Sequence, residues 1–243
     1  MNVGISVPLP AYLVDVGAMA RTAEALGFES FWCAEHPFIP VHTTSRFPGT
    51  ADGVIPEAYS HFIDPFVALA RASGTTSRIK LATGIVLVPE RHPLLLAKEV
   101  STLDLFSGGR FLFGIGAGWL REETQLMGGD FDHRWGQTRE SILAMKELWT
   151  KPEAEFHGKF YDFPPVRSNP KPAQKPHPPV LLAAAPRTCS SASWPGATAG
   201  CRIASRPISS ARAGPPSTGS RRTRAAIPPP SPSRSTDSPP IGT

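Results

Sequence analysis

The sequence predicts an incomplete (β/α)8 barrel, an α/β fold in which helices cover a parallel sheet. Strand-like and helix-like segments alternate through residues 1–182, and the strand-like segments are nearly continuous apolar runs, as expected of strands buried on both faces. Polar residues follow the ends of these strands, where a barrel carries its chemistry. A doubly wound sheet is the alternative, but the first strand-to-helix turn, Pro8–Leu13, lacks the G-x-G-x-x-G sequence of a dinucleotide-binding fold.

The first elements follow one another closely. Val3–Val7 is predicted to be a buried strand, and Asp15–Leu26 has apolar residues at helical spacing, with Asp15 as its N-cap and Gly27 as its stop. Ser30–Ala34 is predicted to be the second strand. Residues 37–62 then form a long connection rich in Pro, Gly and aromatic residues, and a connection of that length usually covers a site or is mobile.

The alternation resumes after this connection. Asp64–Ala72 is predicted to be a helix capped by its first residue, and Ile79–Val88 a strongly apolar strand. Leu94–Phe106 is a further predicted helix, ended by Gly108 and Gly109. Arg110–Ile115 is the fourth predicted strand.

The remaining elements reach residue 182. His133–Trp149 is predicted to be a long amphipathic helix, and Glu155–Phe163 a hairpin that turns at His157 and Gly158. Pro179–Leu182 begins a fifth strand. Because a complete barrel has eight strands, the coded barrel is predicted to be incomplete.

Charge and composition divide the chain at residue 182. The 243 residues carry 25 basic and 20 acidic side chains, but residues 183–243 hold eight arginines, no lysine and one acid, Asp237. This tail therefore has a net charge of +7 and the rest −2. The tail also contains no Leu, Val, Phe, Tyr or Met, so we expect it to be disordered.

Several classes of protein are excluded by the same inspection. No apolar run approaches the roughly 20 residues of a transmembrane helix, and the N-terminus does not resemble a secretory signal. Three cysteines form neither a disulfide framework nor a zinc-type spacing, and the seven histidines are scattered. We expect a cytoplasmic protein with no membrane partner and no metal.

Three segments carry a family resemblance. Ala34–Phe38 (AEHPF), Lys80–Glu123 and Phe156–Val166 (FHGKFYDFPPV) resemble the luciferase-like family of (β/α)8 oxidoreductases, and most closely its branch that uses the deazaflavin coenzyme F420. The resemblance covers residues 1–182 and implies hydride transfer between the deazaflavin and a small organic substrate. An FMN-dependent luciferase-like monooxygenase is the alternative. For an intact family member a homodimer is implied.

The resemblance also implies roles for individual residues. Glu35 matches an acid that contacts the cofactor, although several relatives have Asp there, and His36 matches a proton-transfer group. Histidine titrates near neutrality, which suits that role, but it also commonly bonds a local backbone carbonyl. Trp119 occupies a position where some sugar-phosphate dehydrogenases of the family have Glu, and it suggests an apolar or planar substrate. Glu122 and Glu123 are expected to lie at the surface of a helix.

The implied cofactor site lies at the barrel mouth. Gly84 and Ile85 match a pair joined by a non-proline cis peptide that supports one face of the cofactor ring, and small residues after the fourth strand let the backbone approach the cofactor. Arg91 and His92 are expected only to begin a helix. The full cofactor-binding set that the resemblance implies is Glu35, Thr83, Gly84, Ile85, Val86, Gly116, Ala117 and Gly118.

The tail suggests a change of reading frame. When allowed GC-rich codons for Ala183–Ile203 are read in another frame, one result is GGRAPNVLERVVAWGDGWMPN, which resembles the family's next turn, helix and strand. We hypothesise a frameshift near codons 181–183, which would leave the barrel without its last strands. A genuine basic tail, on an inactive remnant, is the alternative. Its lack of interleaved aromatics makes single-stranded nucleic acid a poor partner.

Overall fold

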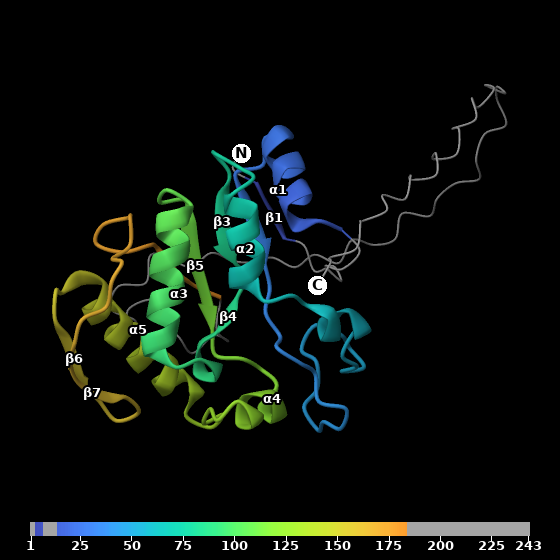
Figure 1. The fold of residues 1–243 in the computed structure, drawn as a ribbon. Helices are drawn as coiled ribbons and strands as arrows, with labels where there is room; N and C mark the ends of the chain where they lie inside the picture. Colours follow the sequence, from blue (N-terminus) through green and yellow to red (C-terminus); the bar gives the residue numbers. More distant parts are fainter. Residues whose placement is uncertain (1–2, 7–13, 184–243) are drawn as a thin grey trace, which may run out of the picture. The chain divides into compact units, whose positions relative to one another are not determined.

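A sheet of six strands forms the centre of the computed structural model, which describes residues 3–6 and 14–183 (Figure 1). Each strand pair in this sheet is parallel. This agrees with the prediction from the alternating strand and helix segments and from the continuous apolar runs of the strands. The carboxyl ends of the strands therefore meet at one edge. The strands are β1 (Gly4–Ser6), β2 (Ser30–Cys33), β3 (Lys80–Thr83), β4 (Val86–Leu87), β5 (Phe111–Gly116) and β8 (Val180–Leu182).

The strand order is that of successive barrel strands. In this order β1 pairs with β2, β2 with β3, and β3 with the beginning of β5, so that Phe31 lies opposite Leu81 and Leu81 opposite Phe111. The end of β5 pairs with β4, and β8 pairs with β5 through Phe113 and Val180. Apart from β4, which pairs with the end of β5, the spatial order of the strands follows the chain order, as it does in a β/α barrel.

Helices cover one face of the sheet. Along the chain, α1 packs on α2, α2 on α3 and α3 on α5, while α2 and α3 also contact β3 and β5 (Figure 1). The buried indole N–H of Trp149 on α5 donates to the carbonyl of Ala97 on α3 at 3.0 Å. The helices are α1 (Val16–Ala25), α2 (Pro65–Ser73), α3 (Pro93–Phe106), α4 (Arg121–Leu126) and α5 (Arg134–Thr150).

Side-chain caps begin three of these helices. Asp15 accepts from the backbone N–H of Ala18 at 3.1 Å, and Asp64 from that of Val67 at 2.9 Å, which satisfies donors that a helix start leaves free. His92 caps α3 in the same way and confirms its expected place at a helix start. Gly27, after α1, has a φ of +83°, a conformation that glycine adopts without a steric penalty.

The predicted strand over residues 79–88 is interrupted. It divides into β3 and β4, and residues 88–90 turn into a short 3₁₀ helix, Val88–Glu90. The apolar run does not reveal this break, because Leu81 and Ala82 before it and Val86 and Leu87 after it are all buried. Periodicity reports burial, and here burial continues where the backbone pairing does not.

The first predicted strand is shorter and more exposed than expected. β1 spans Gly4–Ser6, in which only Ile5 is half-buried. Among the described residues β1 pairs with β2 alone, so its other edge has no neighbour. The hairpin is confirmed as an antiparallel pair, β6 (Ala154–His157) with β7 (Asp162–Val166). The short helix α4 had no counterpart among the predicted elements.

In residues 3–6 and 14–183 no helix has the length and apolarity to cross a bilayer. The described residues all belong to one compact unit, Met1–Ala204. The predictions of a frameshift and of a disordered basic tail fall on residues 183–243, and from residue 184 onward they lie outside the described part of the chain.

Candidate functional site

Three segments chosen from the sequence meet at the carboxyl edge of the sheet. Glu35 and His36 follow β2, Gly84 and Ile85 lie between β3 and β4, and residues 116–119 end and follow β5. The peptide bond between Gly84 and Ile85 is cis, as the family resemblance implies. Since these strands are parallel neighbours, the fold brings all three segments together.

Two of the predicted cofactor-binding residues have side chains that are buried within the sheet. The hydroxyl of Thr83 donates to the backbone oxygen of Gly114 at 2.7 Å and is fully buried. Val86 is likewise fully buried in the core. A Cβ on Gly114 would lie 1.9 Å from the backbone oxygen of Thr83, so glycine is required for β3 and β5 to approach.

The glycine-rich segment after β5 also packs on the chain itself. A Cβ at Gly116 would lie 1.9 Å from Cδ1 of Ile85, so this glycine leaves space for the Ile85 side chain. Gly118 has a φ of +78°, which strongly favours glycine. Half-buried Gly84, Ile85, Gly118 and Trp119 are the members of the predicted set that keep exposed surface at this edge.

Glu35 is bound by the chain rather than left free. One carboxylate oxygen accepts from the N–H of Leu87 at 2.7 Å and the other from Nε of Arg91 at 2.9 Å. Burial raises the pKa of this carboxyl, and the Arg91 guanidinium opposes that rise. In this arrangement Glu35 holds the end of β4 in place.

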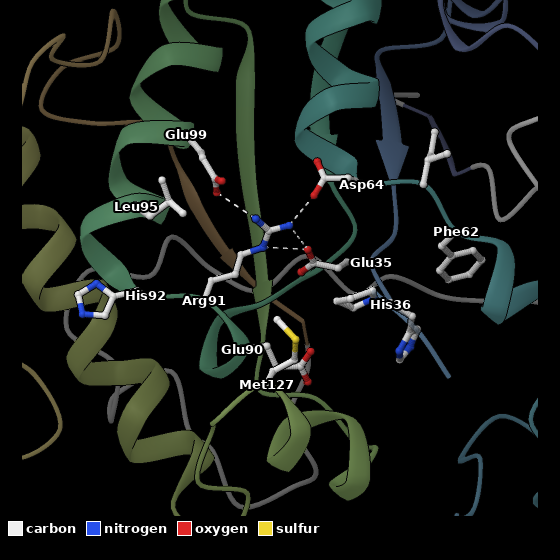
Figure 2. Close-up of a pocket in the computed structure, with 12 residues that line it drawn as sticks. Glu35, His36, Phe62, Asp64, Glu90, Arg91, His92, Leu95, Glu99 and Met127 are labelled. Atoms are coloured by element: carbon white, nitrogen blue, oxygen red, sulfur yellow. Dashed lines mark hydrogen bonds and ion pairs between the residues drawn. The ribbon is translucent and has the colours of Figure 1, made fainter. Parts of the chain in front are cut away.

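Arg91 links three carboxylates in front of a cavity of about 450 Å³ (Figure 2). Its guanidinium binds Glu35, Asp64 and Glu99, and so ties β2, α2 and α3 together. The sequence assigned Arg91 to a helix start without further role, and the structure adds this ion-pair network. The cavity is lined by Glu35, His36, Pro37, Phe62, Ile63, Asp64, Glu90, Arg91, His92, Leu95, Glu99 and Met127.

His36 is buried and paired with a carboxylate. Its Nδ1 lies 2.8 Å and 3.0 Å from the two oxygens of Glu123 on α4. The expectation that Glu123 lies at the surface was wrong, because this side chain is 0% exposed. The physical reason is the partner, since a buried carboxylate is tolerated where a hydrogen-bonding donor faces it.

Aromatic rings surround the His36 imidazole. Tyr59, Phe62 and Trp119 have ring centroids 5.3, 5.9 and 5.7 Å from its own, and Phe47 lies 5.4 Å from Trp119. Phe47, Tyr59 and Phe62 come from the long connection, which here packs over His36. The connection therefore covers the candidate site, as its length predicts.

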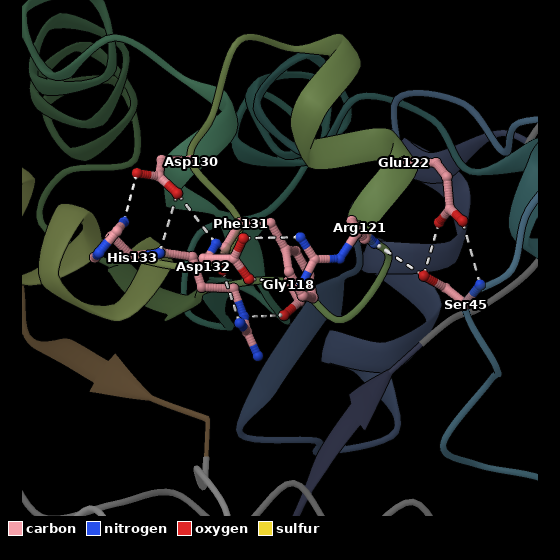
Figure 3. A network of polar contacts seen from close by, with 9 residues as sticks. Ser45, Gly118, Arg121, Glu122, Asp130, Phe131, Asp132 and His133 are labelled. Atoms are coloured by element: carbon pink, nitrogen blue, oxygen red, sulfur yellow. Dashed lines mark hydrogen bonds and ion pairs between the residues drawn. The ribbon is translucent and has the colours of Figure 1, made fainter.

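Glu122, next to Glu123, fastens the same connection from the outside. Its carboxylate accepts from the backbone N–H of Thr44 at 2.7 Å. It also accepts from the hydroxyl of Ser45 at 2.7 Å, a contact that Figure 3 shows. Although partial burial opposes it, these bonds from Ser45 and Thr44 hold the pKa of Glu122 well below its usual range. Glu122 was expected only to lie at the surface of a helix. The structure adds that its side chain anchors the long connection.

Glu90 is a buried carboxyl beside this cluster. One oxygen accepts from the hydroxyl of Thr124 at 2.9 Å, while the other has no hydrogen-bond partner among the described residues. Burial, reinforced by the nearby charge of Glu123, raises the pKa of Glu90 to about 8. No sequence pattern indicated Glu90 as a site residue, because a carboxyl after an apolar strand gives no sign of whether it is solvated.

A family model and curated relatives match this chain. The model described as luciferase-like monooxygenase covers residues 3–192, which include all the described residues. An uncharacterized protein of Mycobacterium tuberculosis is 44% identical over 173 residues, which are 71% of this chain and 61% of that protein. The FMNH2-dependent dimethylsulfone monooxygenase of Pseudomonas putida is 36% identical over 109 residues, or 44% of this chain and 30% of the relative.

Solved structures agree on the fold. The monooxygenase RslO1 from Streptomyces bottropensis matches with a TM-score of 0.63 and 29% identity, over 76% of this chain and 54% of that one. The coenzyme F420 dependent tetrahydromethanopterin reductase from Methanopyrus kandleri matches with a TM-score of 0.56 and 24% identity. The match covers 75% of this chain and 50% of the reductase chain. The chain thus spans only part of the length of these relatives. With its parallel sheet forming part of their barrel, it belongs to the luciferase-like monooxygenase family.

Proposed function

We propose that this chain contributes the ring-binding edge of a coenzyme F420-dependent oxidoreductase that acts on a small organic substrate. The observation that carries the proposal is the meeting of three segments at one sheet edge: Glu35–His36, Gly84–Ile85 and Gly116–Trp119. The relatives of this chain include both an F420-dependent and an FMNH2-dependent enzyme. We propose F420 as the cofactor of this chain.

The residues present fit a planar cofactor ring. Gly84, Ile85, Gly118 and Trp119 give the edge a half-buried surface without charge, which suits the face of a planar aromatic ring system. A bound deazaflavin supplies hydride exchange with the substrate. The chain's part is to support the ring, to exclude water with the aromatic rings of the connection, and to hold a proton at His36.

Each of the predicted site residues receives a role in this proposal. His36 is the proton-transfer residue, and Trp119, whose ring lies edge-on to it, contacts an apolar or planar substrate. Glu35 acts on the cofactor only through the β4 backbone, because Leu87 and Arg91 occupy its carboxylate. Thr83 and Val86 are buried on either side of Gly84 and Ile85, and Ala117 is buried within the glycine segment.

The alternative function is an FMN-dependent monooxygenase. The match to an FMNH2-dependent relative favours it. Equilibrium dialysis of the purified chain against F420 and against FMN separates the two, because the chromophores have different absorption spectra. We expect only weak retention of F420, because the coded barrel is incomplete, and no retention of FMN. Retention of FMN alone would support the alternative, and retention of neither by a chain that circular dichroism shows to be folded would overturn both.

His36→Gln distinguishes binding from chemistry. If His36 moves a proton, this variant binds F420 as the wild type does but loses turnover by a factor of about 10² or more. A variant that turns over normally would remove His36 from the mechanism.

We also propose that the protein forms a homodimer. Apolar side chains on α2 and α3 support this, since Val67, Leu95 and Phe106 are 72%, 61% and 67% exposed. Light scattering after size exclusion tests it, and a monomer at micromolar concentration would contradict it. The cytoplasmic location stays a prediction from the sequence, as does a small molecule as the only partner.

A further inference from the structure

We propose that Glu123 is the positioning residue for His36: its carboxylate fixes the imidazole tautomer with the proton on Nδ1 and so leaves Nε2 as the atom that exchanges a proton. The proposal rests on the proposed function in one respect, the use of His36 for proton transfer. The tautomer itself follows from the contacts of the two side chains and is measurable without any cofactor.

The contact defines which ring nitrogen carries hydrogen. Both oxygens of Glu123 lie within 3.0 Å of Nδ1, and the side chains of Glu123 and His36 are 0% and 6% exposed. An ionised carboxylate only accepts hydrogen bonds, so the nitrogen that faces it must donate. In neutral imidazole the other nitrogen then carries the lone pair.

Other groups near His36 do not compete for this role. Among the described residues, each hydrogen bond of His36 goes through Nδ1 to Glu123. Tyr59, Phe62 and Trp119 restrict the ring by packing, at centroid distances of 5.3–5.9 Å, but their contacts do not distinguish one nitrogen from the other. The choice of tautomer therefore depends on Glu123.

Glu90, the other buried carboxyl near His36, does not compete with Glu123 for the imidazole. Burial and the nearby charge of Glu123 raise the pKa of Glu90 to about 8, so Glu90 holds its proton near neutral pH. Glu90 accepts its bond from Thr124 and makes none to His36. A proton held on Glu90 therefore relieves the repulsion while Glu123 faces the histidine.

The position of α4 explains why Glu123 reaches His36. Glu123 and Glu122 are neighbours on a helix, so their side chains point about 100° apart. Glu122 faces Thr44 and Ser45 of the connection, whereas Glu123 points to the end of β2. Glu122 is therefore a matched control: it is also a hydrogen-bonded glutamate of α4, one residue away, but it does not touch the imidazole.

The test is nuclear magnetic resonance of the whole chain labelled with ¹⁵N-histidine, with His36 assigned by the loss of its signals in His36→Gln. Long-range ¹H–¹⁵N correlations report which nitrogen carries the proton. We expect the Nδ1–H form in the wild type and in Glu122→Gln. In Glu123→Met, which keeps the length of the side chain without an acceptor oxygen, we expect the Nε2–H form that histidine prefers in water.

Two results would overturn the proposal. One is an Nε2–H tautomer in the wild type, and the other is an Nδ1–H tautomer that persists in Glu123→Met. If Glu123→Met does not fold, the wild-type tautomer and Glu123→Gln still decide, because a glutamine can both accept and donate and should give a mixture of the two forms. In that case an Nδ1–H wild type with a mixture of forms in Glu123→Gln supports the proposal, and an Nδ1–H form that is unchanged in Glu123→Gln contradicts it.

Turnover provides a second readout once a substrate is known. Loss of a residue that orients a functional histidine is expected to lower kcat by about 10- to 100-fold with little change in KM, by analogy with the carboxylates that orient metal-bound histidines. Glu123→Gln should recover part of that loss. Should F420 prove not to be the cofactor, the tautomer result stands unchanged, so failure of the proposed function and failure of this inference are distinguishable.

Discussion

Replacing Glu90 with glutamine should change how the stability of this protein depends on pH. Glu90 is 5% exposed, one of its oxygens has no partner among the described residues, and burial together with the charge of Glu123 raises its pKa to about 8. Glutamine keeps the size of the side chain and the acceptor for the Thr124 hydroxyl. Its amide cannot ionise, so the variant resembles the wild type with Glu90 protonated.

The size of the effect follows from proton linkage. In the unfolded chain Glu90 has its ordinary pKa of 4.5, and in the folded protein about 8. Between these values the folded protein keeps a proton that the unfolded chain releases, so the stability is fully present below pH 4.5 and is lost as the pH rises through about 8. The loss is about 1.4 kcal/mol for each pH unit in that window, and about 5 kcal/mol in total as an upper bound.

Urea unfolding of both proteins from pH 5 to 8.5 measures this directly. The quantity to compare is the free energy of unfolding of the wild type minus that of Glu90→Gln at each pH. Contributions from all other titrating groups are shared by the two proteins and cancel in this difference. We expect this difference to fall steadily as the pH rises and to flatten above pH 8. Glu122→Gln is the control, because the lowered pKa of Glu122 places its titration below this range. A difference for Glu90→Gln that is constant over the whole range would refute the reasoning.

Three further outcomes are expected. Arg91→Met leaves buried Glu35 without its cation and should lower the free energy of unfolding by about 3–5 kcal/mol; a loss below about 1 kcal/mol would show that the network is dispensable. Thr83→Val removes a buried hydroxyl that bonds the sheet and should cost about 1–3 kcal/mol in the same assay, with no change contradicting the bond. For the tail, independent genomic sequencing of codons 175–190 should find one base missing or extra, and an unchanged reading would contradict the frameshift hypothesis.

The elements of the fold were largely predictable because they depend on local signals. Asp15 and Asp64 are N-cap residues in front of apolar periodic segments, and both cap helices at those positions. Buried Ile142, Met145, Leu148 and Trp149 occupy one side of α5, as helical spacing requires. Helix α4 was not predicted. The break between β3 and β4 was missed because apolar periodicity cannot distinguish a paired backbone from an unpaired one that is equally buried.

The candidate site was predictable only in part, for a different physical reason. Its backbone positions lie at strand ends, and parallel pairing brings strand ends together whatever the side chains do. The fate of its carboxyls depends instead on partners 52 to 87 residues away, such as Leu87 for Glu35 and His36 for Glu123. No local pattern distinguishes such a residue from a solvated one, and the Glu122–Glu123 pair shows this most clearly.

These two glutamates also connect the cover of the site to its histidine. Glu122 fastens the connection through Thr44 and Ser45, and Glu123 fixes His36, so one short helix restrains both. Phe47 and Tyr59 of the connection in turn pack on Trp119 and His36. A displacement of α4 would therefore loosen the aromatic cover and the imidazole together, whereas two separate anchors would let one move without the other. The position of α4, more than any single side chain, keeps the candidate site assembled.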